Sequence, residues 1–263
     1  MNPEPRVITR INYTGLRTLV EREVGRFLNV YTQTVIAPVV TTLMFYTIFA
    51  LAFGGAGRSV GAIPYMEFLA PGLIMMTMAQ NAFANSSSSV VISKIQGNIV
   101  DVLMPPLSSF EIFAGYITAS MVRGLIVGTA AVIVLSLFAP IHIRAPGTLL
   151  IHAVLGTYMM GALGLAAGVW SEKFDHIAAV TNFAVTPLTF LSGTFYSIGQ
   201  LPEIWQKIAA CNPFFYMIDG FRAGFLEQSD AHIFTGIGVL CAANGFLTLL
   251  VLLMLERGYK IKS

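Results

Sequence analysis

The chain has 263 residues, of which 56% are hydrophobic and only 11% are charged, and its formal net charge is +2. A soluble domain carries about 25% charged residues, so this composition excludes an ordinary water-soluble globular protein. The small net charge provides no strong field for nucleic acid, which we do not expect as a partner. The mean hydropathy of +0.74, in long apolar runs that do not alternate, predicts an all-α integral membrane protein.

The first 33 residues precede any apolar run that is long enough to cross a bilayer. Leu16, Val20, Val24 and Phe27 recur at helical spacing, with Arg and Glu largely between them. This pattern predicts an amphipathic helix that lies at the membrane interface, where its Arg side chains reach the lipid headgroups. The helix is either a plain anchor or an elbow that transmits movement into the first span.

Six apolar runs predict membrane-spanning helices, because a span needs about 20 mostly apolar residues. The runs cover approximately 34–53, 66–92, 112–139, 149–170, 177–196 and 234–255. We therefore expect one transmembrane domain over 1–263, with a cytoplasmic amino-terminal segment at 1–33, a six-span bundle at 34–255 and a cytoplasmic tail at 256–263.

The charges in the loops orient this bundle, since cytoplasmic loops are enriched in Lys and Arg. An even number of spans puts both termini on one side. If that side is the cytoplasm, it holds the five arginines of the amino-terminal segment together with Lys94, Lys173, Arg257, Lys260 and Lys262. The opposite side holds only Arg58, Arg144, Lys207 and Arg222. This bias favours a multi-pass protein with both termini in the cytoplasm.

The loop between the second and third runs is the main cytoplasmic feature. Ile95, Ile99, Val102 and Leu103 share one face of a short helix that also carries Asp101, and two prolines at 105–106 end it. An exposed apolar face outside the membrane needs cover. The cover is either a partner protein or another part of this chain.

Polar residues occur inside two of the predicted spans. The second run contains Gln80, Asn81, Asn85 and Ser88, and the third contains Arg123. Such groups are costly in hydrocarbon unless they meet partners. Two interpretations remain open for them: contacts between packed helices, or the lining of a translocation pathway.

The stretch before the last run is too polar to be a span and too apolar to be a free loop. A short helix begins near Pro202 and presents Trp205, and Asn212-Pro213 marks a turn before a second apolar stretch. We expect two short re-entrant helices on the external side that cap or seal a pathway, because irregular backbone at membrane depth needs protein or a wet cavity beside it.

Several catalytic motifs are absent from the sequence. It contains no Gly-x-x-x-x-Gly-Lys-Ser/Thr phosphate loop, no His-Glu-x-x-His metal motif and no Gly-x-Ser-x-Gly nucleophile elbow. We therefore expect no catalytic residues, no metal site and no cofactor in this chain. Ser192 and His152 are the residue types of a hydrolase pair, but nothing in the sequence orients them.

A series of short motifs runs through the chain in order: Pro71-Gly72-Leu73-Ile74, Leu103-Met104-Pro105-Pro106, Arg123-Gly124-Leu125, Thr186-Pro187-Leu188-Thr189, Leu201-Pro202 and Asn212-Pro213-Phe214-Phe215-Tyr216 with Gly220-Phe221-Arg222. Together they resemble the permease subunits of bacterial type-2 ABC exporters, and among these the small YadH-type permeases. The resemblance covers nearly the whole chain. Its most specific part is the Pro-Phe-x-Tyr-x5-Arg pattern from Pro213 to Arg222.

The resemblance implies a permease of the bacterial inner membrane that pairs with a second copy of itself or with a related permease. Two cytoplasmic ATPase subunits bind ATP and Mg²⁺ and supply the energy. The implied ATPase contacts are Leu16, Val20, Val24, Phe27, Ile95, Ile99, Asp101, Val102 and Leu103. Pro202, Trp205, Pro213, Tyr216 and Arg222 would belong to an external gate.

The resemblance leaves the cargo open among drugs, lipid-linked molecules and polysaccharides. It also leaves open whether the pathway is a channel or a gated cleft. Two alternatives need no ATPase. The first is a secondary carrier or channel, and the second is a membrane scaffold or an intramembrane enzyme.

Overall fold

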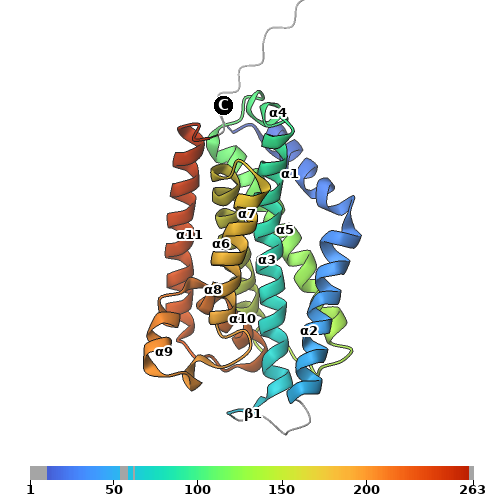
Figure 1. Ribbon diagram of the computed structural model, residues 1–263, viewed down its shortest axis with the longest axis vertical. Helices are drawn as coiled ribbons and strands as arrows, with labels where there is room; N and C mark the ends of the chain where they lie inside the picture. The colour runs from blue at the N-terminus through green and yellow to red at the C-terminus, as the bar shows by residue number, and fades with distance from the viewer. Residues whose placement is uncertain (1–10, 54–58, 62, 261–263) are drawn as a thin grey trace, which may run out of the picture.

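The computed structural model describes residues 11–53, 59–61 and 63–260, and nearly all of them are helical. The long helices form an elongated bundle, with α4 and the carboxyl terminus at one end and β1 and α9 at the other (Figure 1). We call the first the α4 end and the second the β1 end. Arg6, Arg10, Arg58 and Lys262, on which the predicted orientation partly relies, lie outside the described residues.

Within the described part of the chain, four helices are long and apolar enough to cross a membrane. They are Thr32–Ala52, α5 (Ser109–Leu135), α6 (Pro146–Trp170) and α11 (Ile233–Glu256). These helices correspond to the first, third, fourth and sixth predicted runs. The first of them is formed by a π-helical turn at Thr32–Ile36 followed by α2 (Ala37–Phe53), a change of helix type that hydropathy does not reveal.

The second predicted run forms α3 (Tyr65–Ile95), whose 31 residues extend about 46 Å at 1.5 Å per residue. The fifth run forms α7 (Phe174–Val180), a π-helical turn (Thr181–Val185) and α8 (Thr186–Leu191) in direct succession. Neither belongs to the four helices above. The fifth run also ends at Leu191 rather than at the expected Tyr196, because Gly193 adopts a positive φ of 75° in the turn that follows.

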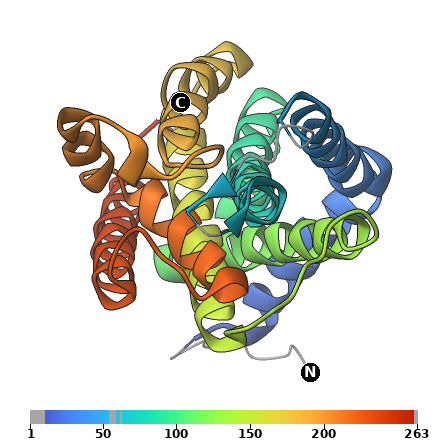
Figure 2. The same ribbon diagram turned by 90° about the horizontal axis from the view of Figure 1, so that it is seen from below.

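The longest helix, α3, lies at the centre of the bundle and packs against α2, α5, α6 and α10 (Figure 2). Small residues allow these close contacts, as is usual between membrane helices. A Cβ atom on Gly164 of α6 would lie 2.3 Å from the carbonyl oxygen of Phe83, and one on Gly128 of α5 would lie 2.3 Å from the sulfur of Met78. These glycines therefore fix how near α5 and α6 approach α3.

The amphipathic helix forms as predicted and spans α1 (Tyr13–Leu28). It lies alongside α5 and carries its buried face on Leu19, Glu23 and Phe27. The presence of a carboxylate on that face was not apparent from the apolar spacing. Asn12 caps the helix by accepting a hydrogen bond from the backbone N–H of Gly15 at 3.0 Å.

The loop between α3 and α5 forms a shorter helix than its pattern suggests. Gly97 has a positive φ of 76° and closes the end of α3, so only α4 (Val100–Leu103), a single turn, follows. At the β1 end, β1 (Ser59–Val60) pairs with β2 (Ile63–Pro64) in a small hairpin that the sequence did not indicate. The 3₁₀ turn Ile198–Gln200, the exposed α9 (Glu203–Ala210) and the buried α10 (Pro213–Leu226) precede α11.

Candidate functional site

The residues around α4 form an apolar surface at the α4 end. Ile95 is 51% exposed and Leu103 is 37% exposed, whereas Val102 is buried and Ile99 is half-buried. Val100 and Met104 are also exposed, although the sequence did not single them out. We define the α4 surface as Ile95, Val100, Leu103 and Met104. The helical spacing did not predict Val100 and Met104, because it assumed one continuous helix from Ile95, whereas Gly97 interrupts that helix.

The predicted contact residues of α1 are less accessible than those of α4. Leu16, Val20 and Val24 are half-buried, and Phe27 is fully buried. The Phe27 carbonyl accepts a hydrogen bond from the Thr34 hydroxyl at 2.7 Å, which ties α1 to the π-helical turn before α2. Phe27 thus lies in the joint between α1 and the first span.

A single carboxylate connects the two candidate coupling segments. The backbone N–H of Asn12 donates to Glu111, and the Asn12 side-chain amide donates to the Pro106 carbonyl at 3.3 Å. Glu111 also accepts from the backbone N–H of Ser108, while its own N–H donates to the Ser108 hydroxyl at 3.3 Å, which forms a capping box at the start of α5. The start of α1 is therefore held to the segment that follows α4. Asp101 is exposed on α4.

One face of α3 carries a row of polar side chains that bond to three other helices. The row consists of Thr77, Asn81, Asn85 and Ser89, which are spaced four residues apart and so lie one above another on the helix. The Thr77 and Thr42 hydroxyls hydrogen bond at 2.6 Å, which connects α3 to α2. The guanidinium of Arg123 donates to the Asn81 side-chain oxygen at 2.9 Å, which connects α3 to α5.

The half of this row that lies nearer the α4 end connects α3 to α1. Arg26 donates to the side-chain oxygen of Asn85 at 3.1 Å and to its backbone carbonyl at 2.9 Å. The Ser89 hydroxyl donates to Glu23 at 2.6 Å, and Arg26 lies 3.2 Å from the same carboxylate. Glu23 is 1% exposed, and Arg22 also lies 3.1 Å from its carboxylate. The face of α3 thus holds α1 by two charged side chains.

The five predicted pathway residues divide into two groups. Asn81, Asn85 and Arg123 are buried between helices of the same chain and bonded as described above. Gln80 and Ser88 are half-buried. Gln80 lines an open cavity of about 330 Å³ between α2 and α3, and Asn81 lines the same cavity together with Thr41, Thr42 and Thr77. The Ser88 hydroxyl donates to the Ala84 carbonyl on its own helix at 2.5 Å.

Arg222 of α10 is the centre of a buried polar cluster near the β1 end. It donates to the carbonyls of Phe68 at 3.2 Å and of Gly193 at 2.6 Å, and its guanidinium lies 3.7 Å from the centre of the Phe68 ring. Gly72 makes this contact possible, since a Cβ there would lie 2.6 Å from the Thr194 carbonyl oxygen. Arg222 therefore joins α10, the start of α3 and the turn after α8.

The other predicted gate residues lie around this cluster with different exposure. Pro202 caps the exposed α9, and Trp205 is 49% exposed on that helix. Pro213 occupies the first turn of α10, where a missing N–H costs nothing. Tyr216 is buried and donates its hydroxyl to the Ala210 carbonyl at 2.9 Å, which fixes α9 relative to α10.

The imagined hydrolase pair is occupied by other contacts. The Ser192 hydroxyl donates to the Leu188 carbonyl and accepts from the Asn212 amide at 2.8 Å. The Nδ1 atom of His152 lies 2.8 Å from the Thr148 carbonyl, and the ring packs against Gly220. Neither side chain is positioned as a nucleophile and base by the contacts it makes.

Long apolar helices, packed around a central helix with a bonded polar face, are typical of an α-helical membrane protein. The ABC-2 type transporter family matches residues 14–226, and the chain belongs to this family. It is therefore a transport permease of an ABC transporter, and such a permease works with an ABC ATPase subunit.

Two kinds of curated relatives support this assignment. The chain is 35% identical over 251 residues to the inner membrane transport permease YadH of Escherichia coli strain K12. The aligned residues cover 95% of this chain and 98% of YadH. It is 28% identical over 192 residues to nodulation protein J of Rhizobium leguminosarum bv. viciae, covering 71% of this chain and 74% of that protein. The family resemblance drawn from the short motifs is thereby confirmed.

Proposed function

We propose that this chain is the permease of an ABC exporter in the bacterial inner membrane, and that it moves a drug, a lipid-linked molecule or a polysaccharide outward. In this proposal α3 and the α7–α8 segment complete six spans, and α9 and α10 are re-entrant helices. Both termini lie in the cytoplasm with the α4 surface. Two copies, or one copy and a related permease, pair around the pathway.

The observation that carries the proposal is the exposed apolar α4 surface, which lies next to the bonded start of α1. A cluster of exposed apolar side chains outside the membrane is typical of a protein interface. An ATPase that binds this surface and moves it would also displace Asn12, and with it α1, through the hydrogen bond from Asn12 to the Pro106 carbonyl. The bonds from Glu23 and Arg26 would carry that displacement to α3.

The binding of ATP takes place on the partner, so this chain contributes mechanical contacts and not catalytic groups. ATP biases the permease only if the ATPase holds the two states of the permease with different affinity. The α4 surface and α1 are the parts through which such a difference would act. Outward opening would then require the cluster around Arg222 to move with α10.

Ile95→Asp and Leu103→Asp test the coupling surface, because each puts a charge on an exposed position without disturbing the buried Val102. We expect at least a tenfold loss of ATPase subunit captured with the purified permease, while membrane insertion stays unchanged. Ile143→Asp is the matched control, since Ile143 is 53% exposed in the loop before α6. Full ATPase capture and drug or lipid export by the two α4 variants would reject the coupling role.

A further inference from the structure

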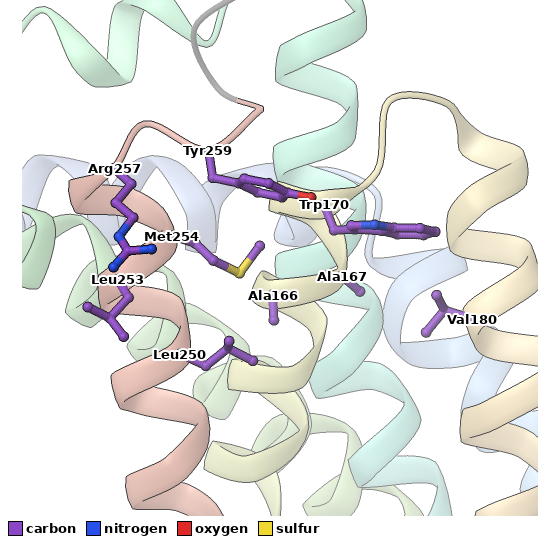
Figure 3. Close-up of a pocket in the computed structure, with 9 residues that line it drawn as sticks. All are labelled: Ala166, Ala167, Trp170, Val180, Leu250, Leu253, Met254, Arg257 and Tyr259. Carbon is purple, nitrogen blue, oxygen red and sulfur yellow. The ribbon is translucent and has the colours of Figure 1, made fainter.

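An apolar groove of about 550 Å³ lies between α6, α7 and α11 near the α4 end (Figure 3). Ala166 and Ala167 form its floor, where the lack of a longer side chain leaves the space open. Leu250 and Leu253 of α11 line one side, and Val180 of α7 lines the other. We call this space the α6–α11 groove. Its size falls within the range of about 300–1,000 Å³ that is usual for sites binding small molecules.

In a membrane, the groove would open to hydrocarbon rather than to water. Both α6 and α11 are among the helices that are long and apolar enough to cross a membrane, and the groove follows their carboxyl-terminal turns. Leu253 is 40% exposed and Trp170 is 41% exposed at its edge. In a bilayer these side chains face lipid tails, so an acyl chain is the molecule at hand to fill the space.

The mouth of the groove combines aromatic rings with a cation that has no partner among the described residues. Trp170 and Tyr259 lie at this end, where aromatic side chains commonly mark the level of the headgroups (Figure 3). Arg257 lines the groove and is exposed, and its guanidinium makes neither an ion pair nor a hydrogen bond with the part of the chain that the structure describes. A guanidinium binds phosphate through two parallel hydrogen bonds.

The neighbouring charges leave this role to Arg257. Lys260 pairs with Glu172 at 2.8 Å and lies 5.6 Å from the centre of the Trp170 ring. Lys94 donates to the carbonyls of Val169 at 2.8 Å and Ser171 at 2.6 Å and so closes the end of α6. The remaining charges nearby, Glu256, Lys173 and Asp175, are exposed and do not line the groove.

We propose that the α6–α11 groove binds one acyl chain of an anionic phospholipid, with the lipid phosphate on Arg257. The apolar floor selects the chain, and the uncommitted guanidinium selects a negatively charged headgroup. This inference rests on the proposed function only for its leaflet, since a cytoplasmic α4 end assigns the lipid to the inner leaflet.

Native mass spectrometry of the purified permease, without an ATPase, tests the headgroup. The detergent-solubilised protein is incubated with phosphatidylglycerol or phosphatidylcholine of identical acyl chains. We expect preferential retention of phosphatidylglycerol and about a fivefold loss of that retention in Arg257→Ala, the factor that corresponds to one basic residue near an anionic surface. Arg144→Ala is the matched control, because Arg144 is also exposed and pairs only loosely with Glu227, at 4.0 Å.

Val180→Trp tests the acyl-chain site by filling the groove and leaving Arg257 in place. We expect it to reduce retention of both lipids, whereas Ile133→Trp, on a 61% exposed position of α5, leaves retention unchanged. Equal retention of the two lipids by the wild-type protein, or unchanged phosphatidylglycerol retention in Arg257→Ala, would overturn the proposal. So would a lipid-free dimer in which a second copy covers the groove.

The same preparations separate this proposal from the function proposed above. Lipid retention uses the permease alone, whereas ATPase capture compares the wild-type protein with the α4 variants. Selective lipid retention together with equal ATPase capture by the wild-type protein and the α4 variants would reject the coupling role and support the lipid site. Loss of ATPase capture in the α4 variants together with no selective lipid retention would do the reverse.

Discussion

Arg123 on α5 and Asn81 on α3 form a hydrogen bond of 2.9 Å inside the bundle, and both side chains are buried. This bond gives one nitrogen of a buried guanidinium its partner, whereas the buried Nε of Arg123 has none among the described residues. Asn81 and its neighbour Gln80 both line the open cavity between α2 and α3, but of the two only Asn81 bonds through its side chain to another helix in the described part of the chain. Adjacent residues of one helix therefore offer a direct comparison between a side chain that joins two helices and one that faces the cavity without such a bond.

Asn81→Ala removes the partner of a buried guanidinium. We expect a loss of about 1–3 kcal/mol in the free energy of unfolding, because a buried donor left without an acceptor bears its full desolvation penalty. Gln80→Ala should change stability by less than about 0.5 kcal/mol and should reduce transport instead. Thermal unfolding in detergent and transport in vesicles measure the two effects. A stability loss at Gln80 equal to that at Asn81 would contradict this division.

Glu23→Ala should loosen α1 from α3, since Glu23 accepts from Ser89 at 2.6 Å and pairs with Arg26 at 3.2 Å. We expect a cost of about 1–3 kcal/mol and faster hydrogen exchange along α1. Glu21→Ala is the control on the same helix, because the Glu21 pair with Arg17 is exposed and such pairs contribute less than about 1 kcal/mol. Hydrogen exchange by mass spectrometry reads both. Equal protection of α1 in the two variants would remove the role of Glu23.

Gly72→Ala should disturb the contact between α3 and the turn after α8. The added Cβ would lie 2.6 Å from the Thr194 carbonyl oxygen and 2.8 Å from the Arg222 guanidinium. We expect a loss of about 1–3 kcal/mol in unfolding free energy, as for other overpacked sites. Gly25→Ala meets no atom within 4 Å and should be neutral or stabilising by up to about 1 kcal/mol. A neutral Gly72→Ala in the same thermal unfolding assay would show that the neighbours yield freely.

The ion pair between Lys260 and Glu172 gives a pH-dependent signal near Trp170. The hydrogen bond from Lys260 lowers the pKa of Glu172, and the same bond raises the pKa of Lys260. A lowered carboxyl pKa means that the contact is complete above the ordinary Glu value of about 4.3 and is lost as the pH falls below it. In Trp205→Phe, which leaves Trp170 as the remaining tryptophan, fluorescence should change on acidification through that range. Lys260→Ala added to this background should abolish the transition, and its persistence would refute the assignment.

The hydropathy pattern predicted the helices, because a membrane span must satisfy its backbone hydrogen bonds within one long apolar segment, whatever its neighbours are. The ends of 149–170 and 234–255 lie within three residues of α6 and α11 for this reason. The π-helical turns at Thr32–Ile36 and Thr181–Val185 and the hairpin at Ser59–Pro64 depend on local packing and leave no mark on the apolar pattern.

The candidate site was less predictable, because its contacts join residues distant in sequence. Arg123 and the polar residues of the second run were identified, but the pairing of Arg123 with Asn81 depends on how α5 and α3 are placed in register. The bond from Ser89 to Glu23 was not predicted, because the apolar spacing of α1 does not show that a carboxylate lies on its buried face. The i, i+4 spacing of polar residues from Thr77 to Ser89 is the sequence signal that indicates the polar face of α3.

Glu111 accepts hydrogen bonds from both Ser108 and Asn12, and the second bond affects the order in which the helices assemble during synthesis. Asn12 precedes its carboxylate partner by 99 residues, so the first helix leaves the ribosome well before the group that anchors it. At about 5–20 residues per second, translation takes roughly 5–20 s to supply Glu111. For that interval the apolar face of α1 lacks α5, the helix against which it packs. Contact with the lipid surface would cover this face until α5 has been synthesised.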